Sequence, residues 1–190
     1  LSYRMSSALT KEEINRKLLH GLAVLIPAGI FYGPGYFEAD RVRVVLLVLC
    51  VMVFALLIEF VRLKHGAFGT WFLGFFGSMM RKEEDRQVTG ATYLMIGSVI
   101  CSLFSIYSEP AAACAFVGLT LFILGDAAAA LVGKGIGRIK IGGKTLEGSL
   151  GCFLTCVLLS LFVFPILPGF IEAWGDDFTL LQVVLLAVTV

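Results

Sequence analysis

One acidic residue lies inside a long apolar stretch of the chain and is followed by a basic, glycine-rich segment. Asp126 falls within the apolar run 110–132, and residues 133–149 then carry repeated glycines and lysines. A carboxylate at membrane depth costs roughly 2.5 to 3.5 kcal/mol on insertion scales, so such a residue usually faces a bundle interior and has a function. Because Mg²⁺ prefers oxygen ligands, we predict that Asp126 binds magnesium.

The segment after Asp126 has the composition of a phosphate-binding loop. Glycines let backbone amides approach an anion closely, and the basic side chains neutralise it. Gly133 follows Asp126 by about 10 Å of helix, so the carboxylate lies within reach of a metal ion held at the loop. Arg138 stands where both a Walker A loop and a dinucleotide fingerprint need glycine, which excludes those two motifs. A flexible basic connector held on anionic lipid headgroups is the alternative.

Two further polar pairs fall at the ends of apolar runs. Arg16 and His20 are four residues apart, hence on one helix face, with Lys17 beside them. Glu59 is followed three residues later by Arg62. Each pair fits either a functional site or an interfacial ion pair with snorkelling side chains. Their convergence on one side of the membrane favours function.

Composition sets these residues in a membrane. The 190 residues are 58% hydrophobic and 15% charged, more apolar than a soluble domain. Because lipid forces backbone groups into helices, we predict an all-α transmembrane bundle forming a single domain over 1–190. A spanning helix needs about 20 apolar residues, and the expected spans are 18–37, 42–61, 88–107, 110–132, 150–167 and an incomplete sixth from 178. We expect the chain to be truncated at its C-terminal end.

The distribution of charge predicts the orientation. Of the 15 lysines and arginines, all but Arg41 and Arg43 lie before the first run, between the second and third, or between the fourth and fifth. The positive-inside rule places those segments, the N-terminus and the candidate site in the cytoplasm. Aromatic residues within 67–80 recur at helical spacing, which predicts either a short core helix or an amphipathic helix in the interface. Thr89 is expected to cap the third span.

In four blocks the chain resembles the polyprenol, dolichol and phytol kinase family. These blocks are 16–20, 59–62, 89–93 and 125–149, and Lys-Thr-Leu-Glu-Gly-Ser at 144–149 is the most specific part. The family includes CTP-dependent diacylglycerol kinases and is related to phosphatidate cytidylyltransferases. The resemblance implies an integral membrane enzyme that moves the γ-phosphoryl group of CTP to the hydroxyl of a polyprenol, dolichol, phytol or diacylglycerol.

The resemblance carries nucleotide binding to Gly125, Asp126, Lys144, Thr145, Gly148 and Ser149. The residue types add further phosphate contacts, predicted for Arg16, Lys17, Arg62, Gly133, Lys134, Gly137, Lys140 and Gly143. Phosphoryl transfer needs positioning and charge stabilisation, so we predict catalytic roles for Asp126 with Mg²⁺ and for Lys144. Glu59 is the first choice and His20 the second for the base that takes the alcohol proton.

Several alternatives stay open. A cytidylyltransferase would attack the α-phosphorus of CTP instead, and a non-catalytic transporter or scaffold would need none of these side chains. Members of the family carry a further segment with a glutamate and an Asp-Asn pair, whereas Glu172, Asp176 and Asp177 come one helix too early. We expect that segment beyond Val190. The expected partners are CTP, a lipid alcohol and membrane lipids, without nucleic acid, and a homodimer through small-residue faces is possible.

Overall fold

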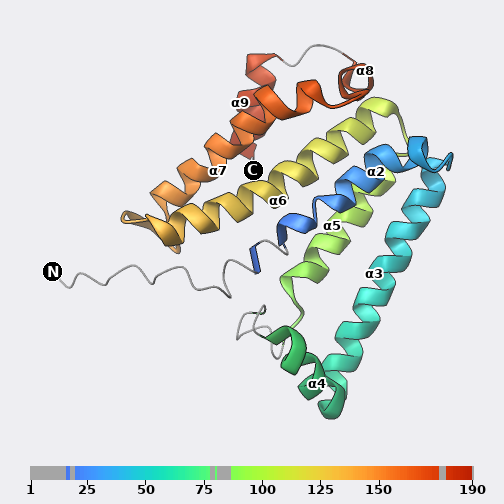
Figure 1. Ribbon diagram of the computed structural model, residues 1–190, viewed down its shortest axis with the longest axis vertical. Coiled ribbons are helices and arrows are strands. Elements are labelled where there is room, and N and C mark those ends of the chain that lie inside the picture. The colour runs from blue at the N-terminus through green and yellow to red at the C-terminus, as the bar shows by residue number, and fades with distance from the viewer. Residues whose placement is uncertain (1–15, 18–19, 78–79, 81–86, 176–178, 190) are drawn as a thin grey trace.

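The computed structural model describes residues 16–17, 20–77, 80, 87–175 and 179–189. Nearly all of this is helical, which confirms an all-α membrane architecture (Figure 1). The helices are α2 (Leu25–Tyr36), α3 (Arg41–Lys64), α4 (Gly66–Phe76), α5 (Gly90–Phe104), α6 (Glu109–Gly135), α7 (Leu146–Leu158), α8 (Phe170–Trp174) and α9 (Leu180–Thr189). A two-stranded hairpin of β1 (Lys140–Ile141) and β2 (Lys144–Thr145) joins α6 to α7.

Three helices in the described part of the chain are long and apolar enough to cross a membrane. They are α3, α6 and the helix Leu146–Ile166, in which α7 continues through a π-helical turn, Leu159–Val163, and a 3-10 turn, Phe164–Ile166. The other expected spans form shorter helices: α2 has 12 residues, α5 has 15 and α9 has 10. The expected span 18–37 is divided, because a turn at 23–24 precedes α2. A count of six spans is therefore not established.

Helix α6 is the central element of the bundle. Figure 1 shows it with α7 on one side and α2 and α5 on the other. In the most apolar 18-residue stretch of α6, 50% is buried within the protein, whereas the corresponding share for α3 is 11%. Aromatic rings fill the core beside it, with Phe31 stacked on Phe116 at 5.1 Å and Phe164 on Phe170 at 5.4 Å between centroids. Helix α3, by contrast, exposes most of its apolar side chains.

The helices alternate in direction, so their ends gather on two sides. At one side lie the start of α5, the end of α6, α4 and the hairpin (Figure 1). At the other, Arg41 of α3 forms an ion pair with Glu109 of α6. The described residues of the polar blocks noted in the sequence thus belong to the first side.

Glycines let α6, the hairpin and α7 approach one another closely. A Cβ atom on Gly148 would lie 2.8 Å from the Ala129 carbonyl oxygen and 3.2 Å from the Gly133 Cα. One on Gly133 would lie 2.6 Å from the Thr145 hydroxyl oxygen. Gly142 has a φ of 63° at the hairpin turn, a conformation that favours glycine. Packing therefore explains much of the glycine repetition after Asp126.

We expect Gly148→Ala to destabilise the protein, because the added methyl group meets the backbone of α6. The free energy of unfolding should fall by about 1 to 3 kcal/mol, the usual cost of overpacking, measured by denaturant or thermal unfolding in detergent. Gly143→Ala is the matched control, since a Cβ there meets no atom within 4 Å. Equal unfolding curves for both variants would contradict the packing role.

Candidate active site

A cavity of about 780 Å³ lies between α4, α5, α6 and the residues that precede α2. Its polar lining comes from elements far apart in the sequence, namely Arg16, Lys17, His20, Glu59, Thr89 and Asp126. The remainder of the lining is mostly apolar. Thr89 was predicted only as a helix cap. The other five residues were predicted site residues, and the fold places them around one cavity.

Asp126 is the centre of the first polar cluster. Its Oδ2 atom accepts a hydrogen bond from Lys17 Nζ at 2.9 Å and lies 3.7 Å from His20 Nε2. Lys17 is 7% exposed, whereas Asp126 is 51% exposed and faces the cavity. Among the described residues, His20 Nε2 has no hydrogen-bond partner although it is buried. The pair with Lys17 offsets the cost of placing the carboxylate in an apolar helix.

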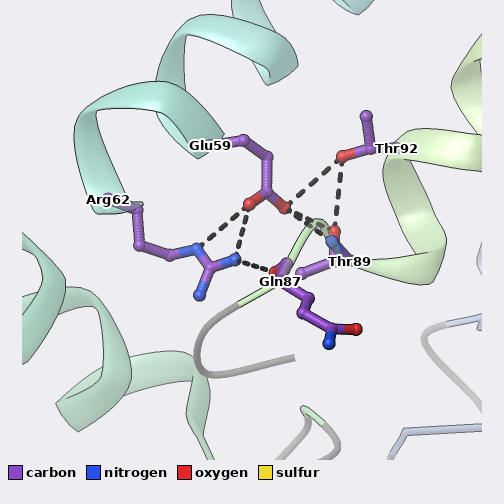
Figure 2. Close-up of polar contacts among 5 residues, drawn as sticks. All are labelled: Glu59, Arg62, Gln87, Thr89 and Thr92. Carbon is purple, nitrogen blue, oxygen red and sulfur yellow. Dashed lines mark hydrogen bonds and ion pairs between the residues drawn. The ribbon is translucent and has the colours of Figure 1, made fainter. Parts of the chain in front are cut away.

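Glu59 is the centre of the second polar cluster (Figure 2). Arg62 donates to its Oε2 atom from Nε at 3.1 Å and from Nη2 at 2.6 Å. Thr89 donates to Oε1 from its hydroxyl at 2.6 Å and from its backbone N–H at 3.3 Å, and Thr92 donates at 3.4 Å. A carboxylate offers about four lone-pair sites, so these five donors saturate Glu59.

The same cluster fixes the short segments around it. Arg62 also donates to the Gln87 carbonyl oxygen at 2.8 Å and lies over the Phe72 ring at 5.7 Å. A Cβ on Gly69 would lie 2.7 Å from the Arg62 carbonyl oxygen, so α4 folds tightly against the end of α3. Thr89 is the N-cap residue of α5, but its side chain makes no capping bond; its hydroxyl donates to Glu59. The expected side-chain cap is thus wrong.

A helix was expected over 67–80, and α4 confirms it as far as Phe76. Residues 78 and 79 of that prediction lie outside the described residues. Trp71 and Phe75 are exposed, whereas Phe72 and Phe76 line the cavity. The aromatic residues therefore serve two surfaces rather than one, and whether α4 lies in the membrane interface stays a prediction.

The segment predicted to bind phosphate contains the β1–β2 hairpin. Lys140 pairs with Thr145 and Ile141 with Lys144 across the two strands. Directly opposed residues share a face and adjacent residues alternate, so Lys140 and Lys144 project from opposite faces of the ribbon. Glu147 accepts hydrogen bonds from the backbone N–H groups of Arg138 and Ile139, and the Thr145 hydroxyl accepts from Gly148 N–H.

The predicted site residues consequently fall into two groups. Arg16, Lys17, His20, Glu59 and Asp126 line the cavity, with Arg62 behind Glu59 and Gly125 buried beside Asp126. A second group belongs to the end of α6, the hairpin and the start of α7, away from the cavity lining, and comprises Gly133, Lys134, Gly137, Lys140, Gly143, Lys144, Thr145, Gly148 and Ser149. Within the described chain, no group of three or more His, Cys, Asp and Glu side chains is placed to hold a metal ion.

Sequence reasoning missed the apolar half of the cavity. Gly97 and Cys101 of α5 and Gly118 and Phe122 of α6 line it. Two glycines inside apolar helices were the available signal, because glycine weakens a helix by roughly 1 kcal/mol relative to alanine. Without the helix pairing, nothing in the sequence says that these positions face each other.

Comparison with known proteins gives distant relatives. The chain is 29% identical over 153 residues to CTP-dependent diacylglycerol kinase 1 of Eremothecium gossypii, a match covering 79% of this chain and 45% of that protein. It is 24% identical over 155 residues to an uncharacterised protein of Rickettsia prowazekii, covering 80% and 71% of the two chains. An uncharacterised protein of Methanocaldococcus jannaschii is 38% identical over 79 residues, which is 41% of this chain and 39% of that one. Neither a family model nor a solved structure matches.

Less than half of the kinase is therefore represented in this chain. The match nevertheless extends over most of the present sequence. The three long apolar helices independently support an integral membrane protein.

The Glu59 cluster makes a prediction about stability. Arg62→Met leaves a buried carboxylate without its counter-charge, which typically costs about 3 to 5 kcal/mol. The double variant Glu59→Gln/Arg62→Met removes both charges and keeps an acceptor for Thr89, so it should recover more than half of that loss. A double-mutant cycle of unfolding free energies in detergent measures this recovery, and strictly additive losses would argue against the pairing.

Proposed function

We propose that the protein is a membrane-embedded kinase that transfers the γ-phosphoryl group of CTP to the hydroxyl of a lipid alcohol. The observation that carries this proposal is the cavity in which Asp126 and two cations lie next to a long apolar compartment. Such a space suits a reaction between a charged nucleotide and an apolar acceptor. The distant match to a diacylglycerol kinase supports CTP as the donor.

Charge explains how the polar end would act. The transferred phosphoryl group carries charge on its equatorial oxygens, so catalysis depends on positioning and electrostatic stabilisation. Lys17 and Arg16 line the cavity beside Asp126, where they would contact the triphosphate. Lys17 would exchange its bond with Asp126 for a phosphate oxygen when the nucleotide binds.

Asp126 is the residue that would hold Mg²⁺. One carboxylate fits this role, since Mg²⁺ in kinases is commonly bound by one or two carboxylates together with substrate phosphates and water. The partial exposure of Asp126 into the cavity makes it accessible to such a complex. When bound, the ion would neutralise charge on the phosphates.

For the base that takes the alcohol proton, we place His20 ahead of Glu59. The donors around Glu59 already use its acceptor sites, so it would have to lose one of them to accept a proton. His20 lines the same cavity with an Nε2 atom that has no hydrogen-bond partner among the described residues. Glu59 then acts as a positioning residue that holds the start of α5 at the cavity.

The hairpin would complete the nucleotide site from its own side of α6. We propose that Lys134, Lys140 and Lys144 attract the triphosphate, with Gly143 and Ser149 leaving room for it at the hairpin and the start of α7. The closely packed residues, among them Gly137 and Gly148, would maintain the shape of this end. The proposal includes a single domain of six spans with this end in the cytoplasm, as the distribution of lysine and arginine favours.

Incubation with γ-labelled CTP and a panel of lipid alcohols tests the reaction. We expect the label in the lipid fraction, and we expect Asp126→Asn to reduce the rate by at least about a hundredfold, as for loss of a group that stabilises transition-state charge. Asp40→Asn is the control, since Asp40 is exposed at the opposite end of α3. Label released as pyrophosphate would indicate a cytidylyltransferase instead.

The choice of base gives a separate prediction. His20→Gln should lower kcat by about 10² to 10⁴ with little change in KM for CTP, as expected for loss of general base catalysis. Glu59→Gln should lower the free energy of unfolding, because it weakens the hydrogen bonds to Arg62 and Thr89. Its effect on kcat should be smaller than that of His20→Gln. Steady-state kinetics on the folded fraction separate the two, and a larger kcat loss in the Glu59 variant would reverse the assignment.

A further inference from the structure

The apolar part of the cavity continues from the polar residues along the interface of α5 and α6. Its lining there consists of Leu94, Gly97 and Cys101 from α5 and Gly118, Leu119 and Phe122 from α6. Gly118 precedes Asp126 by about 12 Å along α6, and Cys101 follows Thr89 by about 18 Å along α5. The space is thus an elongated groove that begins at the candidate reaction centre and runs lengthwise between two helices.

Two glycines leave the wall of this groove open. Among the described residues, a Cβ atom at Gly97 or at Gly118 would meet no atom within 4 Å. These glycines therefore differ from Gly148, whose missing side chain admits the backbone of another helix. Glycine in a helix costs roughly 1 kcal/mol relative to alanine, and in the described part of the chain no close contact at these two positions offsets that cost. The space that they leave is available to a ligand.

The groove is partly open, because residues that line it have exposed side chains. Tyr93 and Phe122 line the cavity and are 67% and 52% exposed. An apolar chain could therefore pass from the bilayer into the groove without crossing water. Because the bilayer is as apolar as the groove, this transfer gives little hydrophobic gain. Selection among chains must come from shape.

We infer that the hydrocarbon chain of the acceptor lipid lies in the groove between α5 and α6, and that Gly97 and Gly118 determine how bulky a chain it admits. This inference rests on the proposed lipid-kinase function, since that function supplies the reason for a hydroxyl group at the polar end. The hydrocarbon chain then extends away from Asp126 and His20, and the space at the two glycines limits how wide this chain can be.

Photolabelling tests the placement of the chain without any need for catalysis. The probe is a long-chain primary alcohol with a diazirine near the end of its chain, added to the intact protein in lipid nanodiscs and analysed by peptide mapping. We expect labelling of α5 and α6 around Gly97 and Gly118, removed by excess unmodified alcohol. Labelling no stronger there than at Phe54, which is exposed on α3, would overturn the inference.

Filling the groove tests the role of the glycines. Gly118→Leu and Gly97→Leu should each lower competable labelling by about tenfold, since a misfit of a few methylene groups in an apolar pocket is worth that much. Gly29→Leu is the matched control, because Gly29 is exposed like Gly118 and has no described atom within 4 Å of a Cβ, but does not line the cavity. If one variant fails to fold, the other carries the test. Unchanged labelling in a folded variant contradicts the proposed width control.

Kinetics separate this inference from the proposed function. If the wild-type protein phosphorylates lipid alcohols, Gly118→Leu should raise KM for a long-chain acceptor by about tenfold and leave the KM of a short-chain acceptor unchanged. An equal rise for both acceptors would overturn the inference and leave the kinase proposal intact. Specific labelling of the groove without phosphoryl transfer to any acceptor would overturn the kinase proposal and retain a lipid-binding groove.

Discussion

A charge placed inside an apolar helical bundle must be stabilised by an opposite charge or by hydrogen bonds, and this constraint organises the site. Asp126 pairs with Lys17 from the start of the chain, and Glu59 pairs with Arg62 one turn later in α3. The first pair joins two separate segments directly, whereas the second lies within α3 and reaches the start of α5 through hydrogen bonds to Gln87 and Thr89. Lys17 is thereby held against α6, and the Glu59 cluster holds the start of α5 against α3.

The two pairs differ in a way that matters for chemistry. Glu59 is enclosed by donors on all sides, so its cluster is complete as it stands. Asp126 remains half-exposed in the cavity, and a nucleotide phosphate could replace it as the partner of Lys17. A saturated cluster supports a fold, whereas a cluster with an exchangeable partner can bind a ligand.

Much of this organisation could be predicted from sequence, because hydropathy and charge act over local windows. The apolar runs located α3, α6 and α7, and the polar exceptions within them identified Asp126 and Glu59. The lengths of α2 and α5 were overestimated, since hydropathy does not report a turn such as that at 23–24. The partner of Asp126 was not foreseen either, because 109 residues separate it from Lys17 and local patterns carry no information on such pairs.

The glycine-rich segment illustrates the same limit. Its composition suggested a loop that wraps a phosphate, but composition does not distinguish a glycine that admits a ligand from one that admits another helix. The contacts of Gly133 and Gly148 belong to the second kind, and the open surroundings of Gly97 and Gly118 belong to the first. Only the pairing of helices separates the two uses.

The alternation of side chains along the hairpin restricts how it can hold an anion. With Lys140 on one face and Lys144 on the other, a single phosphate resting flat on the ribbon meets only one ammonium group. An anion that contacts both ammonium groups must lie at the edge of the hairpin or beyond its turn. Gly142 and Gly143 form this turn and have no side chains that would obstruct the anion. The hairpin would then contact its ligand along its edge or at its tip, and neither face of the hairpin would cover the ligand.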